Sequence, residues 1–300
     1  MARSCSARFI PPSPARSAAA AAALGAACLL FALRVADAQS APCASPAAVT
    51  LADRPGTGRT TSAGGAPCVV LPGEVVIESG WRRQITDDPT GAITLASGPL
   101  ALVRAGVGRR IEVAFAPPAP QSRLVTGIAP ADTARGTSDP VVAVKYLLLD
   151  RAMTQASLGV AYAPPLGRGE FSNGLPTYAL TLNVGTALSP RVSLATSLAA
   201  STAAGADARG LTRSYFVFAP SVTLAYALDS MDTVLLQDAL VSRQGPVLPA
   251  GSRAFVALQR AIGTRLAVDV DYEQNLAPQL GTRARAVGFG VVWIAAPPRR

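Results

Sequence analysis

The second half of the chain alternates apolar and polar positions in segments of about ten residues, a length that suits a tilted strand crossing a bilayer. The alternation is clearest at residues 266–273, where every second residue is apolar and most of the others are acidic. Residues 157–162, 178–185 and 287–293 repeat the pattern. Alternation with a period of two predicts strands with two different faces, one large and apolar and the other small or polar.

The same pattern, read along the whole chain, predicts twelve strands and an orientation for them. Their approximate residues are 74–84, 92–105, 109–117, 139–149, 155–164, 176–188, 191–203, 214–228, 232–242, 251–262, 265–275 and 283–294. Connectors after the even-numbered strands are short, and those after the odd-numbered strands are longer, led by residues 118–138. Short turns face the periplasm in bacterial outer-membrane barrels. The fold class predicted is therefore all-β, an antiparallel transmembrane β-barrel with both termini in the periplasm.

Composition separates this barrel from a soluble β-sandwich, whose strands alternate in the same way. The outward face of a sandwich must carry many charges, whereas here 15% of residues are charged and 50% are hydrophobic. The small face of the strands suits a barrel interior better than a surface in bulk water. Twelve strands lie between small, filled barrels and open porins of roughly 16–18 strands, so we expect a narrow or partly plugged lumen.

Residues 1–38 have the features of a cleavable export signal. Arginines at positions 3, 8 and 16 precede an apolar stretch over residues 18–33, and Ala36-Asp37-Ala38 is a cleavage site of the small-x-small type. We expect the mature chain to start at Gln39. A membrane anchor and a lipid on Cys28 are the weaker alternatives, because the apolar stretch is short and the residues before Cys28 lack the usual branched side chain.

The mature chain divides into three parts. Residues 39–73, which are rich in Ala, Pro, Gly, Ser and Thr, are predicted to form a loosely structured periplasmic segment. Residues 74–294 form the barrel and residues 295–300 a short tail. Removing the signal takes away four arginines and one aspartate and lowers the net charge from +9 to +6. No run of Lys and Arg is interleaved with aromatic residues, so we expect no nucleic-acid partner.

Cysteine and histidine usage limits the chemistry. The mature chain keeps Cys43 and Cys68, and in an exported protein we favour a disulfide between them, worth about 3 kcal/mol by the chain-entropy estimate, over two free thiols. The sequence contains no histidine. This excludes Ser-His-Asp and Cys-His catalysis and every His-ligated metal site. We predict neither an enzyme, nor a metal site, nor a cofactor.

Three stretches resemble a known family. They are ADRPGTGRTT at residues 52–61, VVLPGEVVIESGW at residues 69–81 and DPVVAVKYLLLD at residues 139–150. These stretches resemble the outer-membrane transporters of the phenol meta-cleavage (MetA-pathway) degradation family over residues 52–294. The resemblance implies a β-barrel transporter linked to the use of aromatic compounds, without a defined site. The C-terminus departs from the usual barrel pattern, because Trp293 is followed by Ile294 and a tail rather than ending the chain.

Charged residues on the small or polar faces of the strands are candidates for the lumen. Asp269, Asp271 and Glu273 form an acidic ladder at strand spacing. Such a ladder either biases the pore toward cations or simply keeps the lumen hydrated. A calcium site is disfavoured, because alternate residues fan out along a strand and do not converge. A charge facing lipid is costly, so the remaining lumen candidates are Glu78, Arg82, Glu112 and Lys145.

Arg283 and Arg285 fall on the opposite, outward face, at the end of the last strand nearest the longer connectors. Their guanidinium groups suit the phosphates of lipopolysaccharide, and a solvated rim is the alternative.

These observations predict an outer-membrane barrel that passes small solutes, including aromatic or hydrophobic ones, without covalent chemistry. Its partners are the solute, outer-membrane lipid and lipopolysaccharide, and the barrel-assembly machinery. A barrel acting only as a scaffold or receptor is the alternative, and a membrane-embedded lipid-modifying enzyme is less favoured.

Overall fold

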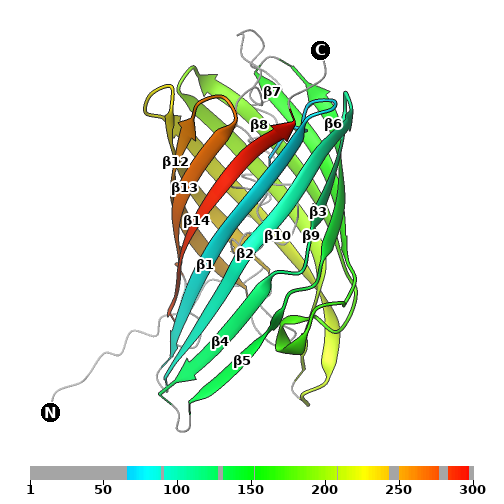
Figure 1. Ribbon diagram of the computed structural model, residues 1–300, viewed down its shortest axis with the longest axis vertical. Coiled ribbons are helices and arrows are strands. Elements are labelled where there is room, and N and C mark those ends of the chain that lie inside the picture. The colour runs from blue at the N-terminus through cyan, green and yellow to red at the C-terminus, as the bar shows by residue number, and fades with distance from the viewer. Residues whose placement is uncertain are drawn as a thin grey trace, which may run out of the picture.

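The computed structural model describes residues 66–88, 91–127, 131–151, 153–207, 209–242, 250–276 and 283–296. Fourteen strands and one short 3-10 helix lie in this part of the chain (Figure 1). Their bounds are β1 (Val75–Asp88), β2 (Gly91–Gly108), β3 (Ile111–Ala116), β4 (Pro120–Thr126), β5 (Asp132–Thr137), β6 (Val141–Asp150), β7 (Thr154–Ala163), η2 (Gly169–Phe171), β8 (Thr177–Ser189), β9 (Val192–Ala206), β10 (Thr212–Ala227), β11 (Asp232–Val241), β12 (Gly251–Ile262), β13 (Leu266–Asn275) and β14 (Arg283–Ala296). No helix of the described residues has the length and apolar character needed to cross a membrane.

Twelve of the described strands form a closed antiparallel barrel. β1 pairs with β2 on one side and with β14 on the other, and the ring runs through β3, β6 and then β7 to β14 in order (Figure 1). Closure leaves none of these strands with an open edge, as a lipid environment requires. The predicted fold class, a barrel of twelve antiparallel strands, is confirmed.

The connector predicted at residues 118–138 contains two further strands. β4 continues the direction of β3 after a break at residues 117–119, and β5 leads into β6 after a break at residues 138–140. β2 is long enough to pair with both β3 and β4, while β4 pairs with β5. The prediction of a plain connector was wrong here. The hairpin escaped notice because both strands are short and polar side chains occupy both of their faces.

The connectors distinguish the two ends of the barrel. The short-turn end carries residues 109–110, 151, 153, 190–191, 228–231 and 263–265, together with the start of β1 and the end of β14, where Val75 pairs with Ala296. The long-loop end carries residues 164–176 between β7 and β8. The placement of the short-turn end in the periplasm stays a prediction.

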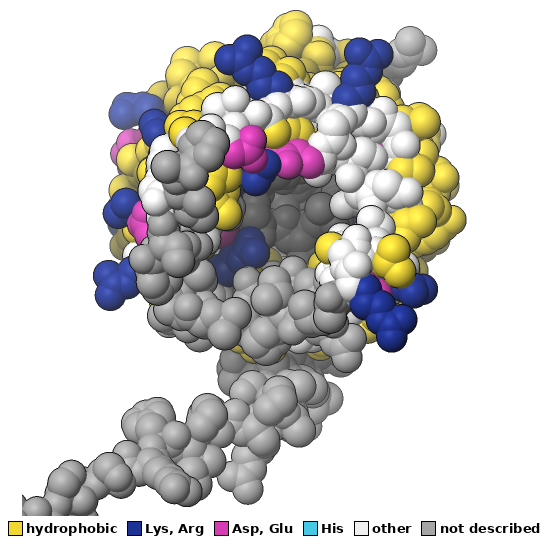
Figure 2. Space-filling view, turned by 90° about the horizontal axis from the view of Figure 1, so that it is seen from below, with side chains coloured by type: hydrophobic (Ala, Val, Ile, Leu, Met, Phe, Trp, Pro, Cys, Tyr) yellow, Lys and Arg dark blue, Asp and Glu magenta, His cyan; other side chains and the backbone are white. Residues whose placement is uncertain are grey.

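The two faces of the wall differ as their alternation requires. Large apolar side chains such as Val160, Val270 and Phe289 are exposed on the outside, whereas their sequence neighbours are buried or half-buried on the inside. The view from the long-loop end shows hydrophobic side chains around the outer wall, Lys and Arg at its rim, and a hollow interior (Figure 2). The many large apolar side chains on the outer face of the described strands suit an apolar solvent.

Val270 tests this assignment, because its side chain is 58% exposed on the outer face. A cation at lipid depth costs about 2–4 kcal/mol. We therefore expect Val270→Arg to reduce the folded fraction strongly, measured by heat-modifiable mobility in gels after refolding into lipid vesicles. Val270→Leu is the control and should fold like the parent chain. Equal folding of both variants would mean that this face does not contact lipid.

Candidate functional site: the barrel interior and a cavity in its wall

Arg104 lies at the centre of a buried ion-pair cluster. From β2 it donates to both carboxylate oxygens of Glu112 on β3, at 2.8 and 2.9 Å, and to Oε1 of Glu78 on β1 at 3.0 Å. The ammonium group of Lys145 on β6 lies 3.8 Å from Glu112. All four side chains are buried. The planar, forked guanidinium group of arginine can bind both glutamates at once, whereas the single ammonium group of a lysine cannot reproduce this geometry.

A second cluster joins β1, β12 and β13. Arg82 lies 3.0 Å from Glu273 and 3.6 Å from Asp271, and Arg253 lies 3.3 Å from the other oxygen of Glu273. Asp269 is buried on the same face of β13. Gly288 leaves room for the carboxylate of Asp271, because a Cβ there would lie 2.4 Å from Oδ2.

The structure thus places all seven sequence-predicted lumen candidates inside the barrel and joins six of them in the two clusters through ion pairs. Sequence reasoning missed Arg104 and Arg253, which complete the clusters. The only available signal for Arg104 was a lone arginine on the same face as Leu102 within an apolar strand. Because Arg82 and Arg253 contact the acidic ladder, much of its charge is compensated, and a preference for cations stays a prediction.

Residues 66–74 lie inside the barrel at the short-turn end, and we call them the lumen segment. Its backbone is held by side chains of the inner wall: Glu112 accepts from the Val70 amide at 2.9 Å, and Lys145 donates to the Cys68 carbonyl at 3.3 Å. Ser157 donates to the carbonyl of Ala66 at 3.2 Å. Residues 66–70 are thus anchored to the inner wall, and the predicted loosely structured segment at residues 39–73 stays a prediction. Residues 39–65 lie outside the described residues.

Gly106 of β2 lets the lumen segment approach the wall. It accepts from the Gly73 amide at 2.8 Å and donates to the Glu74 carbonyl at 3.1 Å. A Cβ at this position would lie 2.1 Å from the carbonyl oxygen of Leu71, closer than any side chain tolerates. Cys68 is disulfide-bonded. Its predicted partner Cys43 lies outside the described residues, so that pairing stays a prediction.

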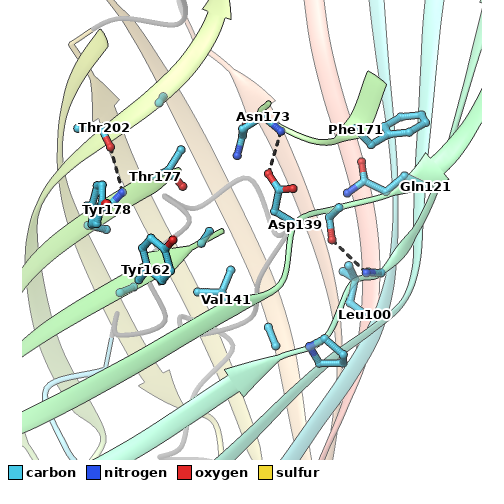
Figure 3. Close-up of a pocket in the computed structure, with 18 of the residues that line it drawn as sticks. Leu100, Gln121, Asp139, Val141, Tyr162, Phe171, Asn173, Thr177, Tyr178 and Thr202 are labelled. Carbon is cyan, nitrogen blue, oxygen red and sulfur yellow. Dashed lines mark hydrogen bonds between the residues drawn. The ribbon is translucent and has the colours of Figure 1, made fainter. Parts of the chain in front are cut away.

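A cavity of about 260 Å³ lies in the wall toward the long-loop end (Figure 3). It sits where the pairing of β6 with β7 stops at Val142 and Tyr162. Tyr162 and Tyr178, exposed on the outer face, line it together with Ala161 and Ala163, which are buried on the inner face. Residues on both faces of the wall therefore contribute to the lining of the cavity.

The lining is apolar with a few polar groups. The rings of Tyr162 and Tyr178 lie 5.2 Å apart with a 35° tilt, and Phe171 of η2 lies on the opposite side of the cavity (Figure 3). Polar groups come from Gln121 on β4 and Asn173 in the loop. An apolar cavity with few convergent polar groups is the usual form of a small-molecule site.

Asp139 fastens the loop that covers this cavity. Its Oδ1 accepts from the Gly167 amide at 2.8 Å and the Ser172 hydroxyl at 2.7 Å, and its Oδ2 accepts from the Asn173 amide at 2.8 Å. Thr137 and Arg168 also exchange backbone hydrogen bonds, at 3.0 and 3.1 Å. The loop thereby takes the place of a strand beside β5. Sequence reasoning did not single out Asp139, whose partners are about 30 residues away along the chain.

Arg283 and Arg285 are exposed on the outer face at the long-loop end. Arg285 lies 3.4 Å from Asp87 of β1. Their binding of lipopolysaccharide stays a prediction.

The comparisons with known proteins identify the fold but not the family. No known protein family and no curated protein matches the sequence. The fold is similar to the COG4313 outer membrane channel from Pseudomonas putida F1, with a TM-score of 0.62, 10% identity, and coverage of 77% of this chain and 98% of that chain. It is also similar to the translocator domain of the autotransporter NalP from Neisseria meningitidis, with a TM-score of 0.52, 11% identity, and coverage of 75% and 90%. The chain therefore has the β-barrel fold found in such outer-membrane proteins.

We expect the stability of the lumen segment to depend on pH through Glu74. Burial raises the pKa of its carboxyl above the ordinary value of 4.5, against the opposing effects of the Leu71 amide and Arg104. The protonated form is thus favoured in the folded state, so the stabilisation is complete below the ordinary pKa and is lost as the pH rises through the raised one. We expect the Gly73 amide to be better protected from hydrogen exchange at about pH 5 than at about pH 7.5, after correction for intrinsic rates.

Glu74→Gln removes the titrating group and should abolish this difference. The same pH dependence in the variant would assign the effect to another group.

Proposed function

We propose that the chain is a channel of the bacterial outer membrane that passes small apolar solutes, including single aromatic rings, without covalent chemistry. One observation carries the proposal: a closed barrel with an apolar exterior contains a wall cavity lined from both of its faces. A scaffold has no need of such a cavity. The cavity is the solute site in this proposal, and Tyr162, Tyr178 and Phe171 supply its aromatic surface.

The sequence and the outer surface both support placement in the outer membrane. The export signal predicted at residues 1–38 directs the chain out of the cytoplasm, and strands rather than helices supply the apolar surface. Trp293 is exposed on the outer face near the end of β14, where the barrel-assembly machinery would read an aromatic residue. The short-turn end would then face the periplasm, with both termini.

The size and chemistry of the cavity indicate the solute class. An apolar cavity of about 150 Å³ is sufficient for benzene, and the cavity here is about 260 Å³. It therefore suits one substituted ring. The tilted tyrosine pair can pack against such a ring, a contact worth about 0.5–1.5 kcal/mol beyond the buried area. This class agrees with the resemblance to transporters of the meta-cleavage family.

The lumen segment supports a selective path rather than a general pore. It occupies the interior at the short-turn end and is held there by Glu112, Lys145 and Ser157. A solute that has entered at the long-loop end must displace this segment or leave through the wall. Lining from both faces makes the cavity suitable for sideways exchange of an apolar solute with the membrane.

The fold alone also suits other roles, since one similar structure is an autotransporter translocator domain. A receptor or scaffold that transports nothing is the remaining alternative. The cavity and its aromatic lining favour the channel, because neither alternative requires a small-molecule site. An enzyme is disfavoured by the absence of histidine from the sequence.

Tyr178 tests the proposed solute site. Its side chain is on the outer face, so Tyr178→Ala should leave the barrel folded. Losing a ring contact of about 1 kcal/mol should reduce uptake of toluene and phenol into proteoliposomes roughly fivefold at subsaturating concentration. Uptake of glucose, a polar solute of similar size, should not change.

Tyr226→Ala is the matched control, because Tyr226 is an exposed tyrosine of β10 near the short-turn end, far from the cavity. Equal uptake by the parent chain and both variants would place the solute path elsewhere. No uptake above that of empty vesicles, by a folded parent chain, would favour the scaffold.

A further inference from the structure

A second surface feature lies on the outer face at the short-turn end, away from the wall cavity. It is a shallow groove across β12, β13 and β14, lined by Ile262, Thr264, Arg265, Leu266, Val291 and Trp293. The proposed solute path does not use it. Its lining combines an apolar floor with a single cation, Arg265.

The floor of the groove comes from side chains of three adjacent strands. Ile262 pairs with Leu266, and Leu266 pairs with Trp293 on the next strand, so these three lie side by side. Ile262 and Trp293 are each 48% exposed. An indole ring with this exposure at the end of a transmembrane strand is typical of the membrane interface. The floor therefore continues from the apolar belt toward the headgroup region.

Arg265 stands at the end of this floor. It belongs to the turn at residues 263–265, in which Gly263 has a φ of +67°, a conformation that favours glycine. The turn is fixed to β14 because the Ile294 amide donates to the carbonyl of Arg265 at 2.8 Å. The Arg265 side chain is exposed and makes no ion pair with the described residues, whereas nearby Arg260 lies 3.7 Å from Asp232.

We propose that this groove binds one phospholipid with an anionic headgroup. The guanidinium group of Arg265 pairs with the headgroup phosphate, the Thr264 hydroxyl donates to a phosphate oxygen, and an acyl chain lies along Ile262, Leu266 and Trp293. The inference rests on the proposed membrane placement, which puts the groove in the leaflet on the short-turn side. The uncompensated charge of Arg265 favours an anionic headgroup over a zwitterionic one.

A free phosphate ion would leave the apolar floor uncovered, and a purely apolar ligand would make no use of Arg265. A lipid satisfies both parts of the groove at once. A planar guanidinium group can bind two phosphate oxygens at once. The hydrogen bond from the Ile294 amide fixes the backbone of Arg265 at the end of the apolar floor.

Native mass spectrometry of the full mature chain, released from micelles doped with equal amounts of phosphatidylglycerol and phosphatidylcholine, tests the proposal. We expect the parent chain to retain one phosphatidylglycerol preferentially. Arg265→Gln should reduce that preference about fivefold, the effect of one arginine near an anionic lipid surface. Inorganic phosphate added in excess should not displace the lipid.

Arg191→Gln is the matched control. Arg191 is an exposed arginine in the turn between β8 and β9, and its carbonyl likewise accepts from the neighbouring strand, at 2.8 Å from the Ala227 amide. Its preference for phosphatidylglycerol should equal that of the parent chain. An unchanged preference in Arg265→Gln, an equal loss in both variants, or displacement by phosphate would each overturn the proposal.

Solute uptake by the same preparations separates this proposal from the channel itself. Arg265→Gln should take up toluene as the parent chain does, because the groove lies outside the solute path. A parent chain that takes up toluene but shows no preferential retention of phosphatidylglycerol refutes only the lipid site. A folded parent chain that retains phosphatidylglycerol preferentially but takes up no toluene refutes only the channel.

Discussion

The hydrogen bonding of the backbone is the constraint on which the rest of this structure depends. A strand in lipid has no water to satisfy an open edge, so β1 must pair with β14 as well as with β2. Closure then fixes an inside and an outside, and the two-residue period of a strand sends neighbouring side chains to opposite solvents. The exposed Val270 and the buried Asp271 are consecutive residues separated by this rule alone. The interior clusters, the lumen segment and the outer groove are all consequences of that separation.

Charges in the two buried clusters come close to balancing one another. Arg82, Arg104, Lys145 and Arg253 face the carboxylates of Glu78, Glu112, Asp269, Asp271 and Glu273. Burying such groups costs more than their pairing returns unless the geometry is good, and removing one partner is costlier still. Several of these contacts join strands that are not consecutive in the chain, such as the pair Arg82 and Glu273. The clusters therefore favour one register of the closed ring over shifted alternatives.

The sequence predicted the strands well, because alternation with a period of two is a local property that every strand of the ring must show. It could not predict β4 and β5, whose short polar segments are strands only because β2 extends beyond β3 to pair with them. The alternation along each strand identified the candidate charged residues but not their partners. Arg104, for example, contacts Glu78, which lies 26 residues away in the sequence. The wall cavity escaped prediction for the same reason. It lies where the pairing of β6 with β7 ends at Tyr162, and the loop held by Asp139 comes from about 30 residues away along the chain.

The lumen segment is continuous with β1, and that continuity changes how its occupancy is controlled. Glu74 is the last residue before the first strand, so the segment is an intramolecular ligand of its own barrel. Its occupancy follows an effective concentration set by the short tether, which is independent of how many copies of the protein a cell makes. Each barrel therefore carries its own occluding group at a fixed stoichiometry of one, and a departed segment returns without having to search the surrounding compartment.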